Sequence, residues 1–154
     1  MELSSILKSA AVKVVSNASS KKRMFQDLCD VAESCYGIPS RDAVEALLER
    51  ESLGPTGVGN GIALPHARMD GIEHVVGVFL KMDKPLDFES VDRKPVDLVF
   101  ALFAPVDSGV EHLKALALVS RTMRDPAICA KLRANDDPSV LHAILVADAG
   151  AQAA

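Results

Sequence analysis

The sequence predicts a single α/β domain in which helices flank both faces of a central β-sheet. Nearly continuous apolar runs at 74–80 and 96–103 are typical of strands that are buried on both faces. Segments with the apolar spacing of amphipathic helices precede and follow these runs. The chain has 154 residues, of which 49% are hydrophobic and 25% charged, and this suits one domain with a substantial core. We place the domain at 1–146, and the sequence leaves open whether the small-residue tail at 147–154 is ordered.

The N-terminal part is expected to contain a strand and then a helix. The strand is predicted at 12–15. Ser19 or Ser20 can cap the helix, and Gly37 is suited to end it. Apolar residues at helical spacing predict one buried face, formed by Phe25, Leu28, Cys29, Ala32, Cys35 and Tyr36.

A second helix leads into a glycine-rich segment. We expect Ser40 to cap this helix, which ends near residues 50 and 51 and buries Ala43, Val44, Leu47 and Leu48. The segment 53–61, LGPTGVGNG, holds four glycines and a proline and predicts a loop with unusual backbone angles. A short strand at 62–64 should follow, and Pro65 stops it.

Three further helices are predicted after the second apolar run. Ser108 and Glu111 have the spacing of a capping box, which would open a helix that buries Leu113, Leu116, Ala117 and Met123. The dipeptides Asp125-Pro126 and Asp137-Pro138 each combine an acidic cap with proline at the first helical position. The last helix is expected to bury Val140, Leu141, Ile144 and Leu145.

Composition excludes several classes of function. Seventeen Lys and Arg against 21 Asp and Glu give a net charge of −4, and a chain with no Trp and one Tyr is unsuited to nucleic acid. Its apolar runs are far shorter than the ~20 residues that span a bilayer, so we expect no membrane insertion. Cys29, Cys35 and Cys129 lack metal-ligand spacing and are expected to be core thiols of a reduced, cytoplasmic protein.

Polar residues suited to phosphate chemistry gather around the glycine-rich segment. His66 should lie at a strand terminus, and its imidazole is a good nucleophile that is substantially neutral near pH 7. Glycine N–H groups could approach phosphate oxygens, and Arg50 would supply a planar cation. The alternative to a phosphate site is that the glycine-rich segment is only a turn and that His66 has a structural role. A P-loop is excluded because Asn60-Gly61 replaces its Lys and Ser or Thr, and a dinucleotide fingerprint is excluded because Ile62 replaces its third glycine.

The segment 51–67, ESLGPTGVGNGIALPHA, closely resembles the phosphorylation-site signature of IIA proteins of the bacterial phosphotransferase system, in the fructose/mannitol class. The resemblance continues through VGVFLKMDKPLDFESVDRKPVDLVFALFAP and EHLKALALVSRTMRD, and it covers about residues 3–146. It implies the mixed-sheet fold of those proteins. It also implies a phosphoryl carrier that works without a cofactor and without a metal ion.

The resemblance assigns roles to individual residues. His66 would accept a phosphoryl group on Nε2 from a phosphorylated HPr-type carrier, in an in-line transfer with its Nδ1–H held by a backbone carbonyl or another acceptor. Arg50 and His112 would stabilise the phosphoryl group, and the expected helix start near His112 would also favour an anion. A purely structural role for His112 stays open. Thr56 and Asn60 are weaker candidates for loop contacts with the phosphate, and structural roles in the loop are weighed equally for them.

The remaining histidines are expected to be unremarkable. His74 should begin a strand, and His142 should be exposed because it falls outside the apolar stripe of the last helix. A metal site with His66 and His112 as ligands is the rival interpretation. No histidine pair has i, i+4 spacing and no carboxylate-rich motif accompanies them, so we expect no metal site.

Within this class, the chain is most similar to the nitrogen-regulatory IIA proteins, around RESLGPTGVGNGIALPHAR and PVDLVFALFAP. Their donor is the nitrogen-branch HPr, and their phosphorylation state regulates partners such as potassium-transport or stress-signalling proteins. We expect this branch because the sequence shows no fused HPr or IIB unit and no membrane segment. Ala67, where many nitrogen-type relatives carry Gly, leaves open a sugar-specific IIA that passes phosphate to a IIB unit for fructose/mannitol-class uptake. A further alternative is a binding module whose unphosphorylated surface alone does the work.

Overall fold

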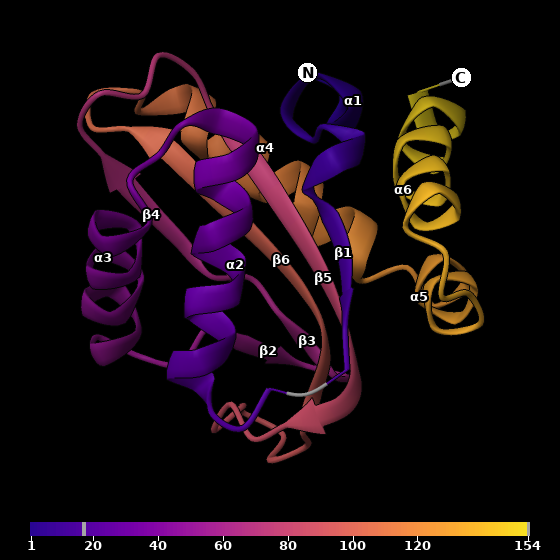
Figure 1. Cartoon of the computed structure of the whole chain (residues 1–154). Helices are drawn as coiled ribbons and strands as arrows, with labels where there is room; N and C mark the ends of the chain where they lie inside the picture. Colours follow the sequence, from indigo (N-terminus) through magenta and orange to yellow (C-terminus); the bar gives the residue numbers. More distant parts are fainter. Residues whose placement is uncertain (17, 154) are drawn as a thin grey trace.

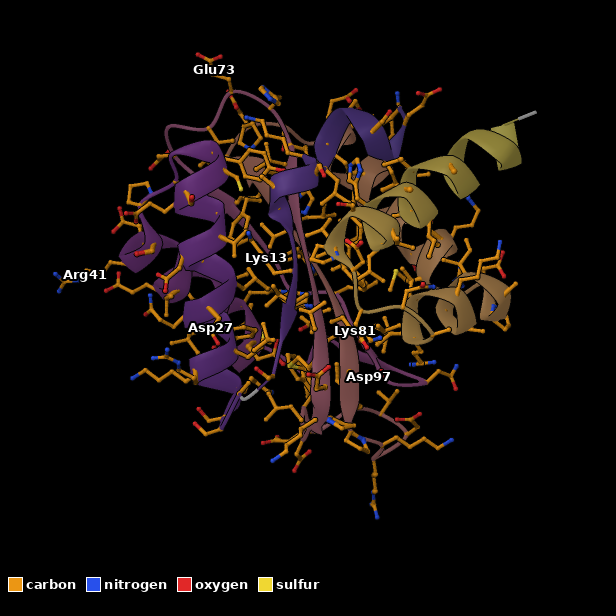
Figure 2. All side chains as sticks on the ribbon, turned by 45° about the vertical axis from the view of Figure 1, so that its right-hand side comes forward. Lys13, Asp27, Arg41, Glu73, Lys81 and Asp97 are labelled. Carbon is orange, nitrogen blue, oxygen red and sulfur yellow. The ribbon has the colours of Figure 1, made fainter. Side chains whose placement is uncertain are left out.

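The computed structural model describes the backbone at 1–16 and 18–153 and the side chains of those residues up to 147. One mixed sheet forms the centre, and helices cover both of its faces (Figure 1). In Figure 2 the sheet stands between α2 and α3 on one side and α5 and α6 on the other. The predicted α/β architecture with helices on both faces is therefore confirmed.

The six strands have the order β1-β5-β6-β3-β2, and β4 also pairs with β6. The two long central strands, β5 (Val76–Leu86) and β6 (Val96–Pro105), are antiparallel. All the other pairs with β5 or β6 are parallel, and β2 and β3 form an antiparallel pair at the edge. The short strands are β1 (Val12–Val15), β2 (Gly57–Gly59), β3 (Ile62–Ala63) and β4 (His66–Met69).

Six α-helices surround this sheet in the described part of the chain. Helix α2 contacts β5 and α3 contacts β4 on one side, whereas α4 contacts β6 and α6 contacts β1 on the other. A 3₁₀ turn at Ser9–Ala11 leads into β1. The helices are α1 (Leu3–Ile6), α2 (Lys21–Tyr36), α3 (Ser40–Ser52), α4 (Val110–Met123), α5 (Pro126–Arg133) and α6 (Pro138–Ala153).

Several predicted element ends are confirmed by local hydrogen bonds. The Ser20 hydroxyl caps α2 by accepting from the Arg23 N–H, and Gly37 ends that helix at a φ of 72°. The Asp125 carboxylate accepts from Ala127 N–H at the start of α5. The strand predicted at 12–15 has these bounds in the structure.

Two predicted caps are wrong. Ser40 lies inside the first turn of α3, and its N–H donates to Glu33 Oε2 at 2.6 Å. Ser108 does not cap α4, because Gly109 occupies the N-cap position and the Ser108 hydroxyl donates to the Pro105 carbonyl. The Ser108 hydroxyl is thus bonded at the end of β6, whereas at α3 the Glu33 carboxylate satisfies the first N–H of the helix.

The buried face of α4 is rotated from the predicted one. Leu113 is 62% exposed and Ala117 is also exposed, whereas His112 is buried along with Ala115 and Val119. The apolar spacing alone fits either register, and packing against β6 selects the face that carries His112.

Smaller corrections concern the remaining predicted positions. Strand β5 begins at Val76, so the exposed His74 precedes it. Val140 is exposed, and the half-buried His142 has its Nε2 3.0 Å from the Leu7 carbonyl oxygen. Helix α6 continues to Ala153, and the side chains after Ala147 lie outside the described residues.

The core lies mainly around β5 and β6. Its largest fully buried side chains are aromatic: Phe25, Phe79, Phe88, Phe100 and Phe103. Cys29 and Cys129 are buried and Cys35 is half-buried, and burial raises the pKa of Cys29 to about 12. Within 1–16 and 18–153, no helix combines the length and the apolar character needed to cross a bilayer.

Candidate active site

His66 opens strand β4 at an interruption in the sheet. Strand β3 ends at Ala63, and the chain passes through Leu64 and Pro65 before His66 pairs with Leu102 of β6. The histidine therefore lies at the start of a strand rather than at the end of the preceding one. The Pro65 carbonyl still accepts from Leu102 N–H, so the interruption is held firmly against the central strand.

The glycine-rich segment before His66 is partly regular. Strands β2 and β3 form a tight hairpin whose turn, Asn60-Gly61, has φ values of 57° and 79°. The predicted unusual backbone angles are present. The signal overlooked in the sequence is the Asn-Gly dipeptide itself, which is typical of a two-residue hairpin.

Arg50 reaches His66 from the last turn of α3. Its Nε lies 3.4 Å from His66 Nε2, and its Nη1 donates to the Gly54 carbonyl at 3.0 Å. The second contact holds the guanidinium against the glycine-rich segment. The structure thus brings the predicted cation to the predicted nucleophile.

The hydrogen bonds of His66 define which ring nitrogen carries its proton. Nδ1 lies 3.0 Å from the Leu64 carbonyl oxygen, which can only accept. Nδ1 therefore carries the hydrogen, and Nε2 keeps the lone pair that faces the Arg50 Nε–H. In the neutral ring, Nε2 is the nucleophilic atom.

His112 lies beside His66 on the buried face of α4. The two ring centroids are 5.5 Å apart and the rings meet edge to face at 65°. His112 is only 6% exposed, and burial lowers its pKa; its electrostatic interactions with His66, when that ring is protonated, and with Arg68 lower it further. Its Nε2 is buried and has no hydrogen-bond partner among the described residues.

Arg68 is a member of this cluster that the sequence did not lead us to predict. Its Nε donates to His112 Nδ1 at 3.1 Å. The available signal was the alternation of a strand, because positions 66 and 68 lie on one face of β4 while Ala67 and Met69 are buried on the other. What the sequence does not indicate is that His112 lies opposite that face.

Thr56 is placed in a different network. Its hydroxyl donates to Glu51 Oε2 at 2.6 Å, and its N–H donates to Glu51 Oε1 at 3.0 Å. Lys21 Nζ lies 2.9 Å from the same Oε1. The buried Thr56 therefore ties the end of α3 to the loop that leads to His66, and its hydroxyl is committed to a carboxylate.

Asn60 lies at the other end of the sheet from His66. Its N–H donates to Asp92 Oδ2, and its carbonyl accepts from Arg133 Nη2. Strand β3 begins just after Asn60 and pairs with β6 at Leu98, whereas His66 pairs at Leu102. The structure brings together His66, Arg50 and His112 and leaves Thr56 and Asn60 with other partners.

The cluster has the donor set of an anion site. Arg50 and Arg68 are permanent cations, and their N–H groups point at the lone pairs of His66 Nε2 and His112 Nδ1. A metal ion would need those lone pairs. Among the described residues, no group of three or more His, Cys, Asp or Glu side chains is placed to hold one.

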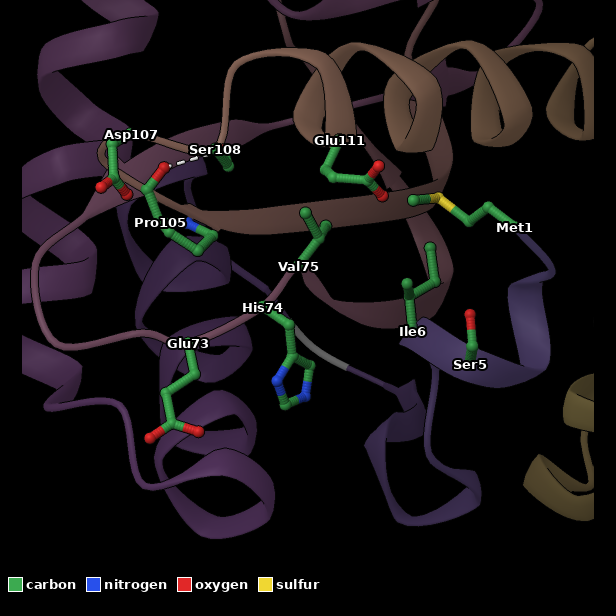
Figure 3. A pocket seen from close by; sticks show the side chains of 10 residues that line it. All are labelled: Met1, Ser5, Ile6, Glu73, His74, Val75, Pro105, Asp107, Ser108 and Glu111. Carbon is green, nitrogen blue, oxygen red and sulfur yellow. Dashed lines mark hydrogen bonds between the residues drawn. The ribbon is translucent and has the colours of Figure 1, made fainter.

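A hollow of about 430 Å³ lies elsewhere, between the start of the chain, the segment before β5 and the start of α4 (Figure 3). Its polar lining includes Glu73, Asp107 and Glu111, and neither His66 nor Arg50 belongs to it. Three carboxylates would repel a phosphoryl group. The hollow is therefore separate from the histidine–arginine cluster.

Comparisons with known proteins agree with this geometry. The family model for the "Phosphoenolpyruvate-dependent sugar phosphotransferase system, EIIA 2" matches residues 5–147. A nitrogen regulatory protein of Bradyrhizobium diazoefficiens is 41% identical over 145 residues, which cover 94% of this chain and 95% of that protein. A fructose-specific EIIA component of Haloferax volcanii is 30% identical over 145 residues, with 94% of each chain covered.

A solved structure is similar over nearly the whole fold. The nitrogen regulatory protein IIA-Ntr from Neisseria meningitidis has a TM-score of 0.83 and 32% identity, covering 92% of this chain and 97% of that one. Sequence and fold therefore point in the same direction, and the chain belongs to the EIIA type-2 family of the phosphoenolpyruvate-dependent sugar phosphotransferase system.

Proposed function

We propose that this chain is a phosphocarrier of a nitrogen-type phosphotransferase relay and that it carries the phosphoryl group on His66 Nε2. The observation that supports this most directly is the tautomer of His66. The Leu64 carbonyl holds the proton on Nδ1, so the lone pair of Nε2 faces the site between Arg50 and His112.

The transfer balances without a separate acid or base. His66 Nε2 attacks phosphorus while the bond between phosphorus and the nitrogen of the donor histidine breaks. His66 becomes a phosphoimidazolium that keeps its Nδ1–H on the Leu64 carbonyl. If the donor ring enters protonated on its other nitrogen, it leaves as neutral imidazole, and no proton moves in the step.

Arg50 would carry most of the electrostatic stabilisation. A phosphoryl group brings about −1.5 to −2 charges at neutral pH, by analogy with other phosphorylated residues. Its equatorial oxygens would meet the Arg50 guanidinium and the His112 N–H, in a site partly shielded from water. The first turn of α4, which contains His112, adds the positive end of a helix dipole.

The donor would dock over an apolar rim. Leu53 follows the helix that carries Arg50, while Val110 and Leu113 flank His112, and all three are exposed. We assign this rim to a phosphorylated HPr-type carrier of the nitrogen branch. Regulatory targets such as potassium-transport or stress-signalling proteins would bind the same rim, and the added negative charge would change their affinity for it.

The sugar-specific alternative has one observation in its favour, the 30% identity to a fructose-specific component. The greater identity to a nitrogen regulatory protein, 41% over a similar length, favours the nitrogen branch. A direct comparison of donors separates the two branches. Faster transfer from a nitrogen-branch HPr than from a sugar-branch HPr is expected.

The test is phosphotransfer from phosphoenolpyruvate through enzyme I-type and HPr-type proteins, read by intact mass. Wild type should gain one acid-labile phosphate, and His66→Ala should gain none. His74→Ala is the matched control, because this exposed histidine lies outside the cluster, and it should label like wild type. Full phosphorylation of His66→Ala would show that His66 is not the residue that carries the phosphoryl group.

A further inference from the structure

We propose that Arg68 is a positioning residue that holds His112 in the tautomer with its hydrogen on Nε2, and thereby makes His112 a hydrogen-bond donor to the phosphoryl group on His66. The inference rests on the proposed function, since it assigns a task to a residue of the same site. Arg68 and His112 are 44 positions apart in the chain and meet through one hydrogen bond.

The hydrogen bond between Arg68 and His112 can run in one direction only. A guanidinium keeps its charge at any physiological pH and has donors only. Arg68 Nε lies 3.1 Å from His112 Nδ1, so Nδ1 must supply a lone pair. A hydrogen on Nδ1 would point at the Arg68 N–H and break the contact.

The burial of His112 decides its charge. The ring is almost fully buried, and this burial lowers its pKa; its electrostatic interactions with His66, when that ring is protonated, and with Arg68 lower it further. The ring is therefore neutral near pH 7 and carries one N–H. With Nδ1 accepting, that N–H is on Nε2.

The Nε2–H of His112 has no acceptor among the described residues. Buried N–H groups, in contrast, are nearly always paired. The ring stands edge to face with His66 at 5.5 Å. A phosphoryl oxygen on His66 Nε2 would supply the missing acceptor, whereas the opposite tautomer would present a lone pair to that oxygen.

The sheet provides the rigid geometry for this arrangement. Arg68 lies two positions after His66 on β4, with Ala67 between them buried on the opposite face. Both residues pair with β6, at Leu102 and Ala104. One short strand thus positions the nucleophile and also the residue that orients the neighbouring imidazole.

Nitrogen NMR of the unphosphorylated protein tests the tautomer directly. Two-bond correlations between ring protons and ring nitrogens distinguish a protonated nitrogen from one with a lone pair, and the His112 signals are assigned by their loss in His112→Ala. Wild type should show His112 with hydrogen on Nε2. Arg68→Met should show a mixture of tautomers or the Nδ1–H form. An unchanged Nε2–H tautomer in Arg68→Met would overturn the proposal.

Kinetics test whether the tautomer matters for transfer. Arg68→Met should slow phosphotransfer about tenfold, the loss expected for one hydrogen bond to a charged group. In a His112→Ala background the same substitution should have almost no further effect, because Arg68 acts through His112. An equal slowing in both backgrounds would mean that Arg68 contacts the phosphoryl group or the donor directly, and the proposal would be wrong.

Two controls complete the design. Arg68→Lys keeps the positive charge but moves the N–H donor away from His112 Nδ1. If Arg68 acts only through its charge, lysine should restore the transfer rate; if it orients His112 as proposed, lysine should not. Arg41→Met removes an exposed arginine at the other end of α3 from Arg50 and should change neither readout (Figure 2). The NMR arm needs no phosphate donor, so a failure of wild type to accept phosphate would contradict the proposed function while the tautomer is still measured.

Discussion

Cations gather at two places in this molecule, and their partners differ. Near His66, the guanidinium groups of Arg50 and Arg68 face neutral ring nitrogens, and among the described residues neither is paired with a carboxylate. At the other end of the sheet, Lys81 Nζ donates to two backbone carbonyls and to Asp136, and Arg133 makes a bidentate contact with Asp97. Figure 2 shows Lys81 and Asp97 together in that second region.

The difference indicates which charges hold the fold and which await a ligand. Lys81 binds the carbonyls of Arg133 and Asn135 where α5 ends, so it also opposes the negative end of that helix. Its charge therefore has a carboxylate and two carbonyl oxygens as partners within the protein. Near His66, no described carboxylate pairs with Arg50 or Arg68, and a phosphoryl group is the ligand that would compensate their charge.

The largest effect is expected for Arg50→Ala. Removing a cation that stabilises the transferring group should slow phosphotransfer on the order of 100-fold. The free energy of unfolding should change by less than about 1 kcal/mol, since Arg50 bonds the Gly54 carbonyl and, at 3.4 Å, His66 Nε2, and has no carboxylate partner among the described residues. Rate and urea unfolding are measured on the same preparation. A large loss of stability with a normal transfer rate would mean that Arg50 holds the fold and does not stabilise the phosphoryl group.

Lys81→Met should have the opposite profile. It leaves two carbonyls and Asp136 without their donor, so the free energy of unfolding should fall by about 2 kcal/mol. Phosphotransfer to His66 should stay within about twofold of wild type under conditions where the protein is folded. Lys13→Met, an exposed lysine on β1, is the control for losing a lysine charge. Strongly reduced transfer in folded Lys81→Met would show that the two regions are coupled.

The smallest effect is expected from pH. The pKa of His112 in the folded protein lies below its usual value of 6.5, because burial opposes the charged form. As the pH falls through 6.5, the imidazole of His112 becomes protonated in the unfolded chain while it is still neutral in the folded protein. This difference lowers the free energy of unfolding progressively below about pH 6.5, and it has no effect at higher pH.

Urea unfolding at pH 7.5 and pH 5.5 measures this contribution. The drop in stability between the two pH values should be smaller in His112→Ala than in wild type, and Lys81→Met should show the wild-type drop. An identical drop in wild type and His112→Ala would contradict the buried, neutral state of this histidine.

Much of the fold could be predicted because its signals are local. The capping serine before α2, the glycine after it and the Asp-Pro starts of α5 and α6 act through residues within one helical turn. The long apolar runs of β5 and β6 reflect burial on both faces. The caps proposed for α3 and α4 were wrong because α3 begins at Ser40 itself, with its N–H bonded to Glu33, and because the Ser108 hydroxyl donates to the Pro105 carbonyl at the end of β6.

The residues of the candidate site also differ in whether local sequence was enough to predict them. His66 and Arg50 lie within one continuous motif, and the resemblance of that motif to a known family was enough to propose both. His112 was proposed from the same resemblance, but the apolar pattern of α4 predicted the wrong buried face around it. Arg68 was missed because its role depends on a residue 44 positions away.

By itself, the sequence determined the fold class, most helix ends and the family, since caps, periodicity and a contiguous motif are encoded by neighbouring residues. Only the tertiary structure decided the rotation of α4, the partners of Thr56 and Asn60, and the contact between Arg68 and His112. Those features depend on strand register and helix packing, and neither is specified by any single stretch of the chain.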